Sequence, residues 1–479
     1  MSRVSVKFAR EWVRRAVQFV ALLAFAYLVV AAPWLKIGWL PSQLFSRLDP
    51  LVGLTAVIAS RALMAYAALG LVTIAFTFVL GRVWCGWLCP LGTLIELTPS
   101  RSGRGAHRLP AWWKYGKYAV FALVLGAAIF GTLAPMVLDP ITIAMRPLQE
   151  IVMPLLGSDA VGVSVGQYLS RDAMRLVAWL SMVPLVVVLA LNAVTRRFWC
   201  RTLCPLGGMV AVGSAASFVR RQVDTEACTR CGKCSRECPT SAISPKQGFA
   251  SSPSECIVCL HCTDACPTAA ISFGPVRTLA PLYVPERRET LIALGATGAS
   301  LAGVLLLPRV AQAKELLRPP GTTEQRLAER CVRCGACYAA CPTGALRPST
   351  SVTSPAGLWT PVLDERPVHC TMDCNLCAPV CPTDALHTPT DQEAIALGLG
   401  GFAVVDKTRC IAWTRGKNCL KCTRLCPISG AIGSTPVVVN THFGPKETRV
   451  PVVTPELCVA CGLCTDSCPV QPAAIVVRR

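Results

Sequence analysis

The chain has 479 residues, of which 53% are hydrophobic and only 15% are charged, a balance too apolar for an ordinary soluble protein. Its 28 cysteines point to metal binding, because disulfide-rich scaffolds are usually short and secreted. Much of the net charge of +20 lies beside apolar runs, which argues against nucleic acid as a partner.

Four apolar runs of about 20 residues, the length that crosses a bilayer, predict transmembrane helices in the first half of the chain. They cover residues 16–35, 62–81, 118–138 and 176–194. The first fifteen residues and the loops 82–117 and 196–221 carry five, six and five Lys or Arg, whereas the loops 36–61 and 139–175 carry three each. The positive-inside rule therefore places the N-terminus in the cytoplasm, with the helices in a bacterial inner membrane.

Two segments with the same cysteine pattern follow the second and fourth apolar runs. They read RVWCGWLCPLGTL from Arg82 and RFWCRTLCPLGGM from Arg197. An Asp-Pro pair, which alone marks only a turn, follows the first and third runs, so residues 16–100 and 118–215 resemble a duplication. The duplication predicts that the cysteines of the two segments meet and hold an iron-sulfur cluster, and two thiol pairs or disulfides acting with a quinone are the alternative. These cysteines are Cys85, Cys89, Cys200 and Cys204.

Residues 223–274 contain two complete copies of the C-x2-C-x2-C-x3-C-P spacing of 4Fe-4S ferredoxins. In this pattern three close thiolates surround one cluster and the fourth normally serves the neighbouring cluster. We therefore expect a cytoplasmic two-cluster domain with crossed ligands. The expected sets are Cys228, Cys231 and Cys234 with Cys266, and Cys256, Cys259 and Cys262 with Cys238.

Residues 285–314 combine Arg287-Arg288, an uncharged run from 291 to 307, and the A-x-A sequence at 311–313. This combination resembles an internal Tat export signal, and a plain fifth transmembrane helix is the alternative. Both interpretations carry the following segment across the membrane, and we expect the helix to remain as an anchor.

Residues 315–479 hold sixteen further cysteines in four groups, each ending in Cys-Pro. In the second group three residues separate the first two cysteines, and in the third group eight residues do. A structural zinc site is excluded, because a zinc ribbon would not need three cysteines followed by Cys-Pro. A periplasmic four-cluster 4Fe-4S domain is predicted. The groups are Cys331, Cys334, Cys337 and Cys341; Cys370, Cys374, Cys377 and Cys381; Cys410, Cys419, Cys422 and Cys426; and Cys458, Cys461, Cys464 and Cys468.

With these motifs in place, residues 1 to about 275 resemble NapH, and residues 285–479 resemble NapG. This family of quinol dehydrogenases feeds a periplasmic nitrate reductase, and related pairs serve methylamine oxidation. The fusion into one chain departs from the family. The resemblance implies nested ligation among the last sixteen cysteines: the first three of groups one and four pair with Cys468 and Cys341, and those of groups two and three pair with Cys426 and Cys381.

The chain has no C-x-x-C-H haem site, no dinucleotide-binding glycine turn and no Walker loop, and its five histidines lack ligand spacing. Electron transfer to or from a quinone is therefore the predicted function. Trp84, Trp87 and Glu96 are the candidates for the quinone site, although the tryptophans also fit an interfacial aromatic belt. The basic residues near the third group would favour a reduced cluster or dock an acidic partner, or simply face solvent. They are Lys407, Arg409, Arg415, Lys417, Lys421 and Arg424.

The predicted fold is thus a multi-domain membrane protein. It has an all-α bundle of four transmembrane helices plus a fifth anchor helix, and two ferredoxin-like α+β iron-sulfur domains. The domains are 1–222, 223–274, 285–314 and 315–479, holding six 4Fe-4S clusters and a seventh at the paired motifs. The partners expected are lipid, quinone and a periplasmic oxidoreductase or its electron carrier, without nucleic acid. An assembly or metal-reducing factor for a respiratory enzyme is the alternative function. An ion pump would need intramembrane carboxylates, which the spans lack.

Overall fold

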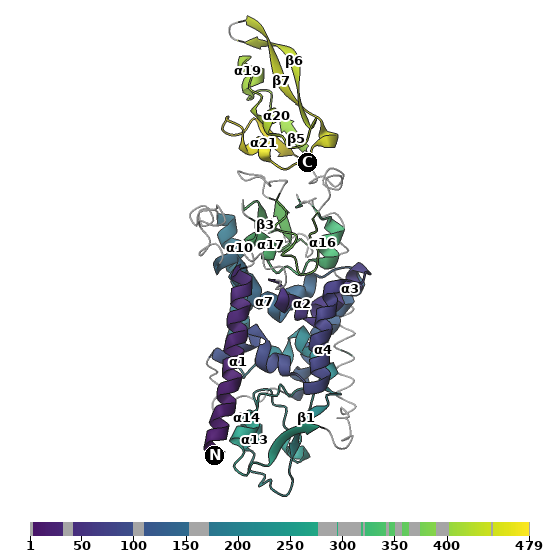
Figure 1. The fold of residues 1–479 in the computed structure, drawn as a ribbon, viewed down its shortest axis with the longest axis vertical. Helices are drawn as coiled ribbons and strands as arrows, with labels where there is room; N and C mark the ends of the chain where they lie inside the picture. Colours follow the sequence, from purple (N-terminus) through teal and green to yellow (C-terminus); the bar gives the residue numbers. More distant parts are fainter. Residues whose placement is uncertain are drawn as a thin grey trace.

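The computed structural model places a helical part between ferredoxin-like lobes along one long axis (Figure 1). The lower lobe comprises residues 219–275, and the middle and distal lobes lie within 318–388 and 402–478. The residues that the structure describes are 3–31, 42–98, 110–152, 172–275, 295, 318–319, 321–341, 344–349, 357–363, 374–388, 402–441 and 444–478. The predicted anchor at 285–314 and Cys370 fall outside them, apart from Gly295.

The helical part contains one long helix, α1 (Arg3–Ala31), and many shorter segments. Residues 42–98 form α2 (Leu44–Leu48), α3 (Pro50–Ser60), η1 (Ala65–Ala67), α4 (Ala68–Leu80), η2 (Trp84–Leu88) and α5 (Pro90–Leu97). Residues 110–152 form η3 (Ala111–Tyr115), α6 (Gly116–Ile129), η4 (Ala134–Leu138), α7 (Pro140–Pro147) and η5 (Leu148–Val152). Then come α10 (Asp172–Leu191), α11 (Phe198–Thr202) and α12 (Pro205–Ser214).

The predicted bundle of four long transmembrane helices is not confirmed. Among the described residues, only Glu11–Val30 is both long and apolar enough to cross a membrane. The second predicted span starts late, because Met64 is extended and only α4 continues to Leu80. The third ends early, because α6 stops at Ile129, just before Gly131 with its φ of +76°, and a separate 3-10 turn begins at Ala134. The shorter apolar helices are Pro50–Ser60, Ala65–Leu80, Trp179–Leu191 and Pro205–Ser214.

Both Asp-Pro pairs begin a helix, which supports the internal duplication. Asp49 caps α3 and Asp139 caps α7, each accepting from backbone N–H groups of the first turn, with proline at the first helical position. Both aspartates are fully buried, and their carboxyl groups lie against each other. Two carboxyls so close cannot both be charged at low cost, so the pair shares a proton.

The shared proton predicts how substitutions at this pair behave. Asp139→Asn should leave the free energy of unfolding nearly unchanged, because the amide oxygen still caps α7 and no buried charge remains. Asp139→Ala should lower it by about 1–2 kcal/mol, because two helix N–H groups lose their acceptor. Thermal unfolding of the two variants side by side measures the difference, and equal losses would contradict the capping role.

The lower lobe is closed by an antiparallel pair of strands. Strands β1 (Val219–Val223) and β2 (Ile271–Pro275) run from the pairing of Val219 with Pro275 to that of Val223 with Ile271. Because the strands join the two ends of the lobe, both cysteine motifs lie on the loop between them. The loop also forms α13 (Lys233–Glu237), η6 (Pro245–Gln247) and α14 (His261–Ala265).

The middle and distal lobes each contain their own paired strands. The middle lobe has α16 (Glu324–Arg330), α17 (Ala336–Ala339), β3 (Leu346–Pro348) and β4 (Pro361–Leu363), with β3 and β4 antiparallel. In the distal lobe β5 (Phe402–Val405) pairs with β8 (Ile475–Arg478), and β6 (Ile432–Thr441) pairs with β7 (Gly444–Val453). Its helices are α19 (Ile411–Arg415), α20 (Lys421–Leu425), η7 (Pro455–Leu457) and α21 (Leu463–Asp466).

Candidate iron-sulfur sites

Four of the cysteine motifs share one backbone conformation. In each, the residue before the second cysteine and the residue after it are left-handed, as at Arg230 and Gly232 with φ of 53° and 72°. The corresponding pairs are Val258 and Leu260, Arg333 and Gly335, and Ala460 and Gly462. Successive turns of this kind aim backbone N–H groups at one point and form an anion-binding concavity. The loops therefore suit an iron-sulfur cluster, whose thiolates and sulfides accept such hydrogen bonds.

The lower lobe groups its cysteines as the crossed pattern predicts. One cavity is lined by Cys228, Cys231, Cys234 and Cys266, and the next by Cys238, Cys256, Cys259 and Cys262. The Ala242 N–H also donates to the Cys238 sulfur at 3.3 Å. Each set has four thiols around one cavity, which fits one 4Fe-4S cluster per set.

The nested pairing predicted for the last sixteen cysteines is wrong. Cys331, Cys334 and Cys337 line a cavity with Cys381 rather than Cys468, and Cys458, Cys461 and Cys464 line one with Cys426 rather than Cys341. Neighbouring motifs pair instead: groups one and two share the middle lobe, and groups three and four lie between the paired strands β5 and β8 of the distal lobe. For the inner groups, Cys377 packs with Cys341 rather than with the predicted Cys426. Cys410 packs with Cys468 rather than with the predicted Cys381.

This pairing predicts which cluster each distant cysteine serves. Cys381→Ala should disturb the cluster held by Cys331, Cys334 and Cys337, in the middle lobe, whereas Cys468→Ala should disturb one in the distal lobe. Electron paramagnetic resonance of the two reduced variants should therefore show different signals missing. If Cys468→Ala instead abolished the signal of the Cys331–Cys337 cluster, identified by comparison with Cys334→Ala, the nested scheme would be restored.

In the helical part the two C-x3-C-P segments have matching positions. Cys89 caps α5 and Cys204 caps α12, each followed by proline, and their sulfurs accept from the N–H groups of Gly92 at 3.4 Å and Gly207 at 3.2 Å. All four cysteines of the two segments belong to one buried cluster and are 5–8% exposed. The structure thus brings together the four thiols that the duplication predicts, on two helix N-termini that favour negative charge.

Burial alone would keep these thiols neutral. It raises the pKa of Cys89 and Cys204 well above the usual thiol range, and the neighbouring cysteines raise both further. Thiolates therefore need bound positive charge here, which iron supplies. The donor set fits an iron-sulfur cluster for that reason.

Two buried arginines cross between the segments, a feature that our sequence analysis missed. Arg82 donates to the carbonyl of Cys200 at 3.5 Å, and Arg197 donates to the carbonyl of Cys85 at 3.0 Å. Each stands three residues before the first cysteine of its own segment and binds the other segment. The shared pattern R-x-W-C was the available signal. Arg82 and Arg197 place two positive charges beside the four cysteines and would stabilise a negative cluster bound there.

The lower lobe is seated directly on these segments. A Cβ added at Gly86 would lie 2.2 Å from the carbonyl oxygen of Ile257, so only glycine allows this approach. The indole of Trp87 donates to the carbonyl of Val258 at 3.0 Å. Buried Lys117 binds Glu255 at 2.6 and 2.7 Å. The loop that carries Cys256 therefore lies against the paired motifs.

Glu96 and Trp87 have polar partners in this structure, whereas the buried indole N–H of Trp84 has none among the described residues. Glu96 accepts from Arg14, Arg197 and Gln18. Although burial opposes it, these donors hold the pKa of Glu96 well below its usual range. Trp87 binds the lower lobe, and Trp84 is buried in the main core. Glu96 therefore orients Arg197 beside the paired motifs.

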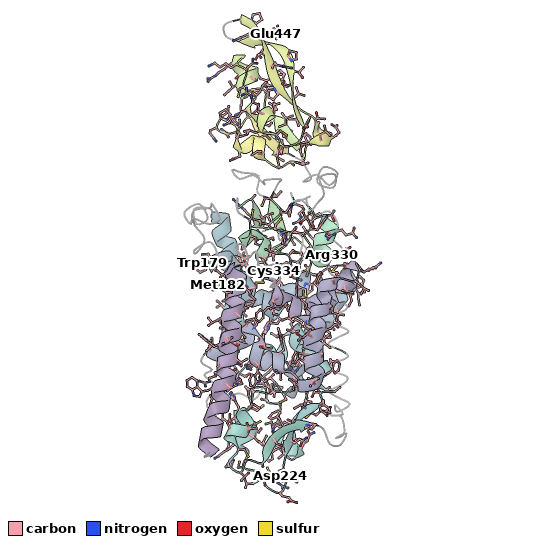
Figure 2. All side chains as sticks on the ribbon, in the orientation of Figure 1. Trp179, Met182, Asp224, Arg330, Cys334 and Glu447 are labelled. Carbon is pink, nitrogen blue, oxygen red and sulfur yellow. The ribbon has the colours of Figure 1, made fainter. Side chains whose placement is uncertain are left out.

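The middle lobe is seated on the opposite end of the helical part. Arg146 donates from its Nε and one terminal nitrogen to the carbonyl of Arg333, at 3.0 and 2.8 Å, and stacks 4.2 Å from the ring centre of Trp359. Arg333 donates to the carbonyl of Leu133 at 2.7 Å. Figure 2 shows Cys334 at the height of Trp179 and Met182 along the long axis, with Asp224 far below. A second cysteine site thus adjoins the helices from above.

In the distal lobe the basic residues of the third group mostly face solvent. Lys407 lies 4.5 Å from the ring centre of Trp413. Five of the six are exposed and Arg409 is half-buried. The exposed five are Lys407, Arg415, Lys417, Lys421 and Arg424.

Comparison with known families assigns iron-sulfur binding to most of these segments. Models described as a 4Fe-4S binding domain match residues 62–104, 176–221, 221–244 and 451–472. Models described as a 4Fe-4S dicluster domain match residues 249–342 and 330–385. The first two ranges contain the C-x3-C-P segments. No solved structure matches the chain.

Several curated ferredoxin-type proteins are similar to the chain. It is 33% identical over 200 residues to the methylamine utilization ferredoxin-type protein MauM of Methylobacillus flagellatus, covering 40% of this chain and 83% of MauM. It is 31% identical over 211 residues to the ferredoxin-type protein NapG of Haemophilus influenzae, covering 41% of this chain and 73% of NapG. It is 29% identical over 217 residues to YccM of Escherichia coli, covering 44% of this chain and 56% of YccM. The resemblance to NapG is confirmed, and that of the first half to NapH stays a prediction. The chain therefore belongs to the family of ferredoxin-type iron-sulfur electron-transfer proteins that includes NapG and MauM.

Proposed function

We propose that the protein is membrane-bound and exchanges electrons between the quinone pool and a periplasmic oxidoreductase. The observation that carries this proposal is the succession of cysteine sites along the long axis. The lower lobe lies against the paired C-x3-C-P segments, and the middle lobe is seated on the other end of the same helices. Such a succession suits stepwise electron transfer.

The surface of the helical part supports a membrane position. Large apolar side chains are exposed on α1, α4 and α10, although a soluble protein rarely exposes such continuous apolar surface. Lipid would cover these faces, with the short helices packed behind them. Among them are Phe19, Val20, Leu23, Leu71, Phe76, Trp179 and Val183, which are 51–70% exposed.

The charge of the loops favours one orientation. The lower lobe follows the basic segment 196–221, so it lies in the cytoplasm, and the middle and distal lobes lie in the periplasm. In this orientation the chain crosses the membrane between the lower and the middle lobe, where the predicted anchor at 285–314 lies. A reporter enzyme that is active only in the periplasm should be active when it is fused after Arg479. Activity of a reporter that works only in the cytoplasm would contradict the orientation.

Six clusters would occupy the ferredoxin motifs and a seventh would be held by the four cysteines of the helical part. These groups supply one-electron redox chemistry when bound. A quinol that becomes a quinone releases two electrons and two protons. Because each cluster accepts one electron, the two electrons would leave one at a time, and the protons would pass to water. The role of the chain is to space the sites, exclude water from them and balance their charge with Arg82, Arg197, Arg146 and Arg333.

The exposed basic residues of the distal lobe favour an acidic redox partner. Lys417, Lys421 and Arg424 lie around the third cysteine group, and a complementary acidic surface would speed the encounter. The partner is thus a periplasmic oxidoreductase or its electron carrier with acidic side chains near its own redox centre.

Anaerobic reduction of the purified full-length protein tests the function. A short-chain quinol should bleach the visible absorption of the clusters, and a soluble quinone should reoxidise clusters reduced with dithionite. A protein acting only as an assembly or metal-reducing factor would respond to dithionite and not to either quinone form. That result would overturn the proposal.

A further inference from the structure

A buried polar group lies in the helical part directly below the middle lobe. Gln149 and Glu150 stand in the π-helical turn η5, which follows α7, and Ser181 stands on α10. They are 2%, 3% and 1% exposed, and the Ser181 hydroxyl donates to the Glu150 carboxylate. Turns of this type are rare and often occur at functional sites.

Gln149 is the decisive residue of this group. Within the part of the chain that the structure describes, both the oxygen and the nitrogen of its side-chain amide are buried without a hydrogen-bond partner. An unsatisfied buried polar group costs about 1–3 kcal/mol, so such a side chain usually faces a ligand or water. An amide can donate to a carbonyl oxygen and accept from a hydroxyl. These are the two groups that interconvert when a quinol becomes a quinone.

The position of Gln149 suits electron transfer. A Cβ added at Gly335, in the loop between Cys334 and Cys337, would lie 3.4 Å from the Cβ of Gln149. The Cys331–Cys337 loop is therefore in contact with the residue that would hold the ring. Leu148, which precedes Gln149 in the chain, packs against the same apolar core that contains Cys334.

Helix α10 connects this group with the outer surface. Ser181 faces inward, whereas Trp179 and Val183 are 70% and 51% exposed on the same helix. A quinone head near Ser181 can therefore extend its apolar tail along a lipid-facing helix. The lower candidate, Glu96, is by contrast occupied by Arg14, Gln18 and Arg197.

We propose that Gln149, Glu150 and Ser181 form the polar part of a quinol-binding site under the Cys331–Cys337 loop. This inference rests on the proposed exchange of electrons with quinone. It places the entry of electrons from quinol at the middle lobe, on the periplasmic end of the helices, and not beside the C-x3-C-P segments.

Binding of a short-chain quinone to the full-length protein in lipid nanodiscs tests the site. Gln149→Leu and, as a smaller change, Ser181→Ala should each raise the dissociation constant at least tenfold, with iron content unchanged. Gln18→Leu, the matched change beside Glu96, should leave it unchanged. Weakening by Gln18→Leu alone would overturn the site in favour of the lower one.

Quinol reduction of the clusters separates the two proposals. If quinol reduces the clusters of the wild-type protein and of both variants at equal rates, the site is wrong and the function stands. If quinol fails to reduce the wild-type clusters, the function fails and the site fails with it. A tenfold slower reduction in both variants, with dithionite reduction unaffected, supports both.

Discussion

Replacing Cys85 or Cys200 with alanine should remove one and the same iron-sulfur cluster and leave the six ferredoxin clusters in place. Each C-x3-C segment offers two thiols, and both pairs of cysteines are buried in the core of the helical part. A cluster with four thiolate ligands therefore needs both segments. Iron analysis should show a loss of about four iron atoms in each single variant and no further loss in the double variant.

Cys228→Ala is the matched control for this experiment. It removes a ligand of the lower-lobe cavity lined by Cys228, Cys231, Cys234 and Cys266, so a different signal should disappear by electron paramagnetic resonance. An unchanged iron content in Cys85→Ala would show that the four thiols act as redox thiols or disulfides. Additive losses in the double variant would mean that the segments bind iron separately.

Gly86→Val should separate the lower lobe from the helical part. Because even a Cβ would stand 2.2 Å from the Ile257 carbonyl, the loop must move and Trp87 loses its bond to Val258. Overpacking of this kind costs about 1–3 kcal/mol or more, and the separated surfaces would also expose Lys117 and Glu255. Limited proteolysis should cleave the lower lobe at least tenfold faster in the variant.

Gly274→Ala provides the comparison, because its added Cβ would meet only the Gln222 side chain at 3.8 Å. It lies on β2 of the same lobe and should leave proteolysis unchanged. Equal sensitivity of the two variants would mean that the lobe is held elsewhere. Clusters of the lower lobe should remain in Gly86→Val, since its cysteines are not displaced from one another.

Local spacing predicted the ligands of the lower lobe because the fold there is local. Both motifs lie between two strands that pair within one short segment, so crossed sharing follows from the sequence. In the last 165 residues four motifs are available, and their spacing does not say which of them share a lobe. The nested scheme failed for this reason.

Hydropathy predicted apolar helices without their lengths. Gly131 and Met64 interrupt runs whose composition is uniformly apolar, because backbone conformation and packing end a helix where hydropathy does not change. Buried ions were also difficult to anticipate. The sequence predicted Lys117 and Arg82 to be exposed charges of a cytoplasmic loop. Both are buried against the lower lobe, where Lys117 pairs with Glu255 and Arg82 donates to the carbonyl of Ser254.

The crossed arginines have a consequence for the origin of the chain. Arg82 of the first half binds the carbonyl of Cys200, and Arg197 of the second half binds the carbonyl of Cys85. Neither half therefore contains all the residues of the site. An ancestor with a single half could have built the same centre only as a symmetric homodimer, each copy lending its arginine to the other. Gene duplication then freed the two halves to diverge: today the first arginine pairs with Glu255 and the second with Glu96.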